Sequence, residues 1–101
     1  MFIYNVTTKV AGHIADEWLQ WLQEEHIPEI TATGCFTGAT ILRLLEVDDS
    51  EGPTYAIQLA ANNKELYEDY LENYADQLRQ KSFDKWGNQF ISFRSFMQIV
   101  Q

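Results

Sequence analysis

The hydrophobic residues of this chain alternate between two spacings, and the order of these spacings restricts the fold more than any other feature. A spacing of two is typical of a strand with one buried face, and a spacing of three to four is typical of an amphipathic helix. Strands are predicted at 2–10, 36–47, 55–61 and 89–100, and helices at 14–26 and 63–78. This β-α-β-β-α-β order predicts a single α+β domain of the ferredoxin-like class over residues 1–101, with a four-stranded antiparallel sheet and both helices on one face.

Both predicted helices carry one apolar stripe. The stripe of the first helix consists of Ile14, Trp18, Trp21 and Leu22, and that of the second of Tyr67, Tyr70, Leu71, Tyr74, Ala75 and Leu78. Pro28 disfavours helical backbone at the preceding residue, so the first helix is expected to end near His26, with room for one short turn more. Residues 80–86 are expected to form an irregular connection to the last strand.

The strands have more large apolar residues than two helices can cover. Whichever face meets the helices, several members of one set stay uncovered: Ile41, Leu42, Leu44, Leu45, Phe93 and Phe96. Burial of apolar surface contributes about 25 cal/mol per Å², and so small a domain needs that stabilisation. The sequence therefore predicts a homodimer in which two sheets pack face to face.

Charge and composition exclude several classes of partner. Fifteen acidic residues against seven Lys and Arg give a formal charge of −8, which repels nucleic acid and anionic membrane surfaces. The single cysteine forms no internal disulfide, and no apolar run approaches the roughly 20 residues of a membrane span. The start of the chain lacks the basic and apolar regions of a secretion signal, so a cytoplasmic protein is expected.

Several motifs carry a resemblance to a known family. They are Trp18, Glu25-His26-Ile27-Pro28, Thr33-Gly34-Cys35-Phe36, Gly52-Pro53-Thr54-Tyr55-Ala56-Ile57-Gln58, Tyr70 and Phe93-Arg94. Together they resemble the domain-of-unknown-function family 4286 of short bacterial proteins, which is similar to the dimeric α/β-barrel superfamily. The resemblance implies a homodimer and a cleft between sheet and helices, as in the small monooxygenases and isomerases of that superfamily. It implies no activity, because the family has none assigned.

His26 is the candidate catalytic residue. Histidine titrates near pH 6.5, and the carboxylates of Glu25 and Glu29 are close enough in sequence to tune it as an acid or base. The alternative is structural, because a cationic histidine at a helix C-terminus interacts favourably with the exposed carbonyl groups.

Five further residues are candidate ligand-binding residues in the cleft: Asn5, Arg43, Gln58, Tyr70 and Arg94. The arginines can bind a carboxylate of a ligand or pair with acids across the dimer. The tyrosine stripe is equally consistent with ordinary core packing. Cys35 can act as a nucleophile if His26 activates it, although a cysteine at the start of a strand is more often a small buried apolar residue.

No metal or other cofactor is expected. His13 and His26 lie at opposite ends of the first helix, about 20 Å apart, so they cannot hold one ion within a subunit. Haem-degrading members of the superfamily place a histidine on the second helix, and this chain has none there. The predicted function is binding of a small molecule in the cleft, with cofactor-free catalysis left open. The alternative is a non-catalytic homodimeric interaction or regulatory module.

Overall fold

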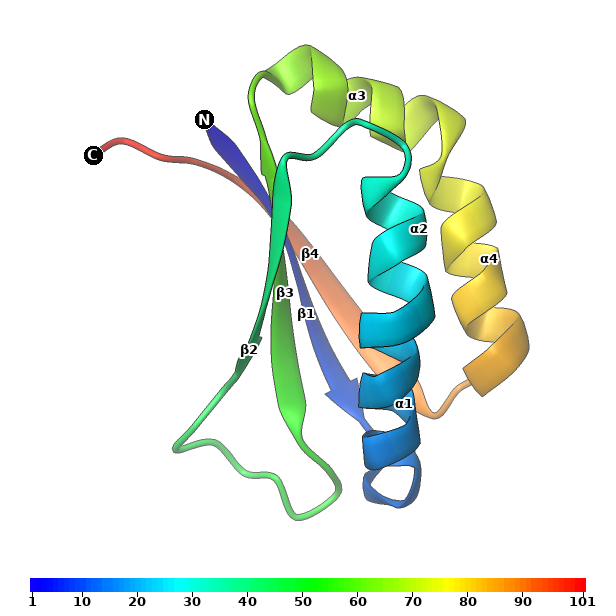
Figure 1. Ribbon diagram of the computed structural model, residues 1–101. Coiled ribbons are helices and arrows are strands. Elements are labelled where there is room, and N and C mark those ends of the chain that lie inside the picture. The colour runs from blue at the N-terminus through cyan, green and yellow to red at the C-terminus, as the bar shows by residue number, and fades with distance from the viewer.

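The computed structural model describes residues 1–101 and has the predicted ferredoxin-like architecture. The strands are β1 (Phe2–Val10), β2 (Gly38–Arg43), β3 (Thr54–Ala61) and β4 (Phe90–Gln98), and the helices are α1 (Ala15–Trp21), α2 (Ile27–Thr31), α3 (Lys64–Asn73) and α4 (Ala75–Trp86). The sheet is antiparallel with strand order β2-β3-β1-β4. All four helices lie on one face of it (Figure 1). The prediction of the fold class is confirmed.

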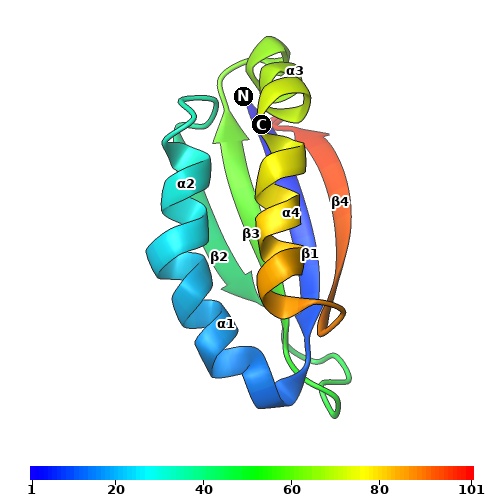
Figure 2. The ribbon, with the colours of Figure 1, turned by 90° about the vertical axis from the view of Figure 1, so that its right-hand side faces the viewer.

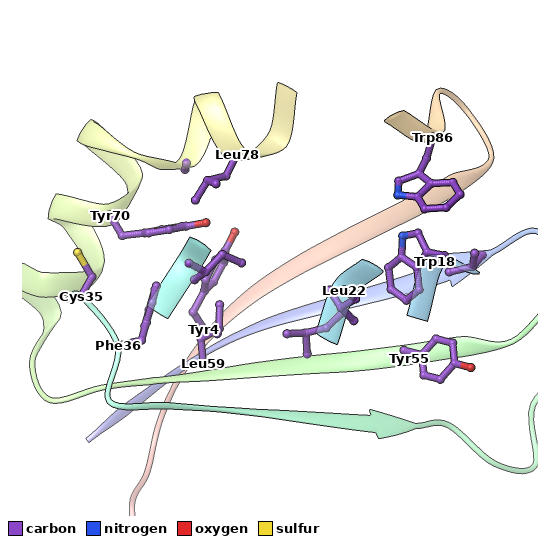
Figure 3. Close-up of a cluster of buried hydrophobic side chains, with 14 of the residues drawn as sticks. Tyr4, Trp18, Leu22, Cys35, Phe36, Tyr55, Leu59, Tyr70, Leu78 and Trp86 are labelled. Atoms are coloured by element: carbon purple, nitrogen blue, oxygen red, sulfur yellow. The ribbon is translucent and has the colours of Figure 1, made fainter. Parts of the chain in front are cut away.

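The core lies between this face and the helices. Alternate residues of β1 and β3 point into it, and Tyr4 is only 3% and Leu59 1% exposed. Seen from the helix side, α1 and α2 lie end to end, α4 runs beside them over the sheet, and α3 lies across one end of it (Figure 2). Figure 3 shows the buried side chains in two groups, with Tyr4 and Tyr70 at one end and Trp18 and Trp86 at the other.

The first helix continues past the point where the sequence predicted its end. Leu22–His26 forms a π-helical segment that joins α1 directly to α2, and the amide of Ile27 donates to the carbonyl of Leu22. Pro28 lies in the first turn of α2, where a missing N–H is tolerated. The wider turn of the π segment accommodates the proline, so His26 lies inside a continuous helix and not at its C-terminus.

The second helical region is also longer than predicted. Residues 80–86 belong to α4, whose buried residues are Ala75, Leu78, Ser82 and Trp86. These positions are spaced by three and four residues, so they form one stripe against the core. The helix ends at Gly87, which has a positive φ of 61°. The prediction of an irregular connection was wrong because the polar residues around Gln80 obscured this stripe.

The loop between β2 and β3 is held against the end of β1. Gly52 has a φ of 146°, and a Cβ there would lie 1.8 Å from the carbonyl oxygen of Val10. The adjacent backbone pairs with the same segment, since the amide of Gly12 donates to the carbonyl of Glu51 at 2.9 Å. Only glycine fits this position, where the loop approaches the end of β1 closely.

The face of the sheet away from the helices is exposed and partly apolar. Its large apolar side chains include Ile91, which is 56% exposed, Phe93 at 67%, Leu42 at 42% and Met97 at 41%. Ile41 and Phe96, by contrast, pack against the core on the helix side. The sequence thus predicted correctly that apolar residues remain uncovered. None of the helices has the length and hydrophobicity needed to span a bilayer.

Candidate functional site

A cavity of about 80 Å³ lies between the sheet and the helices. Eleven of its 17 lining residues are hydrophobic, and they come from both groups of buried side chains, with Tyr4 and Tyr70 at one end and Trp18 at the other (Figure 3). Mostly apolar walls with a few polar groups are typical of a small-molecule site. The volume suits a few water molecules or a small organic compound.

The polar groups of the cavity come from every layer of the fold. They are Thr8 on β1, His26 on the π segment, Tyr70 on α3, Arg79 and Ser82 on α4, and Ser92 and Arg94 on β4. Three of the groups are bonded within the chain: the hydroxyls of Thr8 and Ser92 lie 2.8 Å apart, and the guanidinium of Arg79 donates to the Tyr4 hydroxyl at 2.9 Å. The exposed side chain of Arg94, on the edge strand β4, lies at the opening of the cavity.

The π segment explains the position of His26. In an α-helix residues five apart point in directions about 140° apart. The π segment adds one residue to the turn, which brings residues five apart closer to the same side of the helix, and the rings of Trp21 and His26 stack with centroids 4.6 Å apart and planes 20° apart. Trp21 in turn meets Trp86 edge to face at 5.9 Å. The histidine is therefore held in place by aromatic packing at the wall of the cavity.

Burial in this aromatic environment keeps His26 uncharged. Desolvation lowers the pKa of His26 to about 4, although the carboxylate of Glu29 acts in the opposite direction, and the ammonium of Lys81 lowers it further. The imidazole is thus neutral at pH 7, with one nitrogen donating and the other accepting. A cationic helix cap and a charged acid catalyst both need a protonated imidazole, which this burial disfavours at neutral pH.

Tyr70 supplies a protonated hydroxyl. Its ring packs edge to face on Phe36 with centroids 4.9 Å apart, and it is only 4% exposed. Burial raises its pKa to about 12, and the nearby Tyr4 adds to this, whereas the guanidinium groups of Arg79 and Arg94 act in the opposite direction. At pH 7 Tyr70 can therefore donate a hydrogen bond into the cavity.

The structure brings together three of the predicted site residues, His26, Tyr70 and Arg94. Asn5 and Gln58 do not join them, because they are paired neighbours in register on the opposite face of the sheet. The Asn5 amide donates to the Thr7 hydroxyl at 2.9 Å. Assigning these two residues to the same cleft as His26 was therefore wrong.

Arg43 and Cys35 also lie outside the cavity lining. The guanidinium of Arg43 is exposed at the end of β2 and pairs with Asp49 at 3.3 Å. Cys35 is 1% exposed, and its thiol donates to the carboxylate of Asp69 at 3.5 Å. Burial raises the pKa of Cys35, with Asp69 adding to this effect, so the thiol is a poor nucleophile.

Sequence reasoning missed Arg79, Ser82 and the pair of Thr8 and Ser92. Arg79 and Ser82 were missed because the second helix was predicted to end at residue 78, whereas α4 continues to Trp86. Had α4 been extended to Gly87, Ser82 would have fallen four residues after Leu78 on the buried stripe. Thr8 and Ser92 face each other across β1 and β4, and no single-sequence signal reveals such a pairing.

Comparison with models of known protein families identifies the family of this chain. The model of a domain-of-unknown-function family, DUF4286, matches residues 1–100. The chain belongs to the DUF4286 family. A comparison of this DUF4286 chain with curated proteins gave no significant match.

Solved structures similar to this DUF4286 chain share its fold at low sequence identity. A dimeric ferredoxin-like protein from an uncultured marine organism has a TM-score of 0.76 and 10% identity, covering 99% of this chain and 95% of that one. SnoaB from Streptomyces nogalater, a cofactor-independent oxygenase, has a TM-score of 0.66 and 11% identity, covering 99% and 94%. An ethyl tert-butyl ether d (ethd) family protein from Bacillus halodurans has a TM-score of 0.65 and 7% identity, covering 94% and 97%. At these identities the likeness shows the ferredoxin-like fold alone.

Proposed function

We propose that this protein binds a small molecule in the cavity between its sheet and helices. The observation that carries the proposal is the convergence of His26, Tyr70 and Arg94, from three different elements, on one cavity with mostly apolar walls. Apolar walls supply affinity, and a few fixed polar groups supply orientation and specificity. The aromatic stacking of His26 fixes its ring, which reduces the entropy lost on binding.

The site supports binding better than proton-transfer catalysis. A general base works best with a pKa near the operating pH, and His26 with a pKa of about 4 is a weak base. Neutral imidazole and protonated phenol are suited to hydrogen bonding a ligand. The solved structure of a cofactor-independent oxygenase shares this fold, but one fold hosts many activities, so that likeness does not extend to the reaction.

Heteronuclear NMR of the indole groups tests the proposal. The chain has three tryptophans, of which Trp18 and Trp21 line the cavity and Trp86 packs against Trp21. Addition of a set of small anionic, neutral and cationic compounds is expected to shift the indole N–H signals for some members of the set. The shifts should vanish in His26→Ala and persist in His13→Ala, which alters an exposed histidine near the start of the same helix. No indole shift with any compound would contradict the proposal and favour the interaction module.

We further propose that two copies associate through the open face of the sheet. The observation behind this is the apolar patch of Leu42, Ile91, Phe93 and Met97. Large exposed apolar side chains gathered on one face of a sheet are typical of an interaction site. The similar structure from a marine organism is described as a dimeric ferredoxin-like protein, which supports a dimer.

Light scattering coupled to gel filtration tests the dimer. Wild type is expected to elute as a dimer, and Phe93→Asp as a monomer, because the two-fold axis would bury two new carboxylates in the interface. Gln77→Glu adds the same charge on the helix side, at an exposed position, and should remain dimeric. A monomeric wild type at micromolar concentration would rule out this assembly.

A further inference from the structure

The cavity contains cationic side chains and no carboxylate, although the chain has 15 acidic residues against seven Lys and Arg. Five of the seven Lys and Arg side chains have a carboxylate or an aromatic ring as a partner within the chain. Ion pairs to carboxylates are formed by Lys9, Arg43, Lys64 and Lys81. The ammonium of Lys85 lies 5.3 Å from the centroid of the Trp86 ring. The two that remain, Arg79 and Arg94, both line the cavity.

Packing alone does not explain why the two cations without an acidic or aromatic partner both line the cavity. A guanidinium that is partly withdrawn from water, as that of Arg79 is, favours a counter-ion, and in so acidic a chain carboxylates are abundant. Arg79 has five N–H donors, and its one hydrogen bond to a side chain is to the Tyr4 hydroxyl. Arg94 forms neither an ion pair nor a side-chain hydrogen bond within the chain. Donor capacity is therefore left over at the cavity and its opening.

The two arginines act on the same part of the cavity. Both guanidinium groups lower the pKa of Tyr70 against the larger effect of burial, so both lie within electrostatic reach of its hydroxyl. The Tyr70 hydroxyl is a third donor there. At the other end the walls are aromatic, with Trp18 and Trp21 in the lining.

A fourth unused donor lies behind this aromatic wall. The indole nitrogen of Trp86 is the one buried side-chain nitrogen or oxygen without a hydrogen-bond partner, and Trp86 is 7% exposed. Buried polar groups are almost always hydrogen bonded, so an orphan donor marks a place where an acceptor is missing. The Trp86 ring lies over Trp18, at the end of the core opposite Tyr70 (Figure 3).

We infer that the cavity binds a small organic carboxylate, held by the guanidinium groups of Arg79 and Arg94, with its apolar body against the aromatic wall. This inference rests on the proposed small-molecule site and names the class of ligand. The planar fork of a guanidinium matches a carboxylate, and the donor groups left over on Arg79 and Arg94 favour a ligand that accepts hydrogen bonds. A volume of about 80 Å³ restricts the body to a few carbon atoms.

Binding of propionate and of its neutral isostere propionamide tests the inference, with the indole and His26 signals as the readout. Charge-assisted hydrogen bonds are about twice as strong as neutral ones, so propionate is expected to bind about tenfold more tightly. Arg94→Gln is expected to reduce this preference to less than twofold without affecting the fold, because Arg94 has no partner within the chain. Arg79→Lys keeps the charge but removes the fork, and is expected to weaken propionate binding several-fold.

Arg43→Gln is the matched control, because it removes the same charge from an arginine that pairs with Asp49 outside the cavity. It should bind propionate like wild type. Equal affinity for the acid and the amide would overturn the carboxylate inference and leave the small-molecule site intact. A loss in Arg43→Gln as large as in Arg94→Gln would also overturn it, since net charge and not the cavity would then govern binding. If neither compound affects the cavity signals, the proposed site fails as well.

Discussion

Phe93 and Arg94 are neighbours on β4, yet they belong to two faces of the sheet that differ in what covers them. Arg94 points to the helix side and lines the cavity, whereas Phe93 points to the open side and is 67% exposed. A simple binary pattern would place the aromatic residue inside and the cation outside. Under the two proposals above, this reversal has a reason on each face. The covered face gives up some apolar packing for a ligand site, and the open face keeps apolar residues for a second copy.

The largest expected effect is a difference in unfolding free energy between truncations on the two faces of the sheet. Leu59 is 1% exposed on the covered face, and Leu59→Ala is expected to lower the free energy of unfolding by about 3 kcal/mol, because a cavity remains where the side chain was. Leu42→Ala alters a leucine that is 42% exposed on the open face, and its cost should be below about 1 kcal/mol in the monomer. Urea unfolding of both variants in the Phe93→Asp background measures this without the dimer. Equal costs would contradict the assignment of the faces.

A pH effect of intermediate size should come from His26. Its pKa of about 4 in the folded state lies below the ordinary value of 6.5, so the unfolded chain binds more protons between these values and stability falls as the pH falls. Between pH 7 and pH 5 the loss should be about 2 kcal/mol, and it levels off below pH 4. The difference in unfolding free energy between wild type and His26→Gln isolates this contribution.

His13→Gln serves as the control for the pH experiment, because it alters an exposed histidine that is bonded to Gln89 at 2.7 Å. This variant should retain the pH dependence of wild type. The same pH dependence of the unfolding free energy in His26→Gln as in wild type would show that the histidine ring is not buried in the covered face.

The open face should make stability depend on protein concentration. If unfolding is coupled to dissociation, each tenfold dilution lowers the stability of the dimer by about 1.4 kcal/mol. Calorimetry of wild type over a hundredfold range of concentration should therefore show a falling melting temperature, whereas that of Phe93→Asp should stay constant. A melting temperature of wild type that does not change with protein concentration would contradict the dimer through the open face.

The smallest expected effect is on ligand affinity, when a polar residue of the open face is replaced. Gln58→Ala removes a half-buried amide from the open face, opposite Asn5 in the neighbouring strand. Its affinity for a cavity ligand should stay within twofold of wild type, because the sheet separates it from the site. A larger loss in an NMR titration would return Gln58 to the ligand-binding residues.

The fold could be predicted from the sequence because hydrophobic spacing is a local property. β1 was predicted as 2–10 and observed as Phe2–Val10, since its alternation is regular. The course of the first helix past Pro28 could not be predicted, because the proline signal is local and the π segment that accommodates it is stabilised by the packing of Trp21 on His26 and Trp86.

The site was harder to predict, because it depends on which face of each strand the helices cover. The spacing of residues shows that Asn5 and Tyr4 point in opposite directions, but not which of them points to the helices. Arg94 was placed correctly within the cavity lining and Asn5 was not. Arg79 required the true length of α4, which the buried stripe ending at Trp86 determines only once its core partners are known.

The most direct test is a titration of propionate into Phe93→Asp, followed by NMR. If the two faces are independent, this variant is a monomer that binds propionate with the affinity of wild type, and the signals of His26 and the indole groups of Trp18 and Trp21 shift. Loss of binding together with the dimer, or shifts confined to the strands of the open face, would contradict the separation of a ligand-binding face from an assembly face.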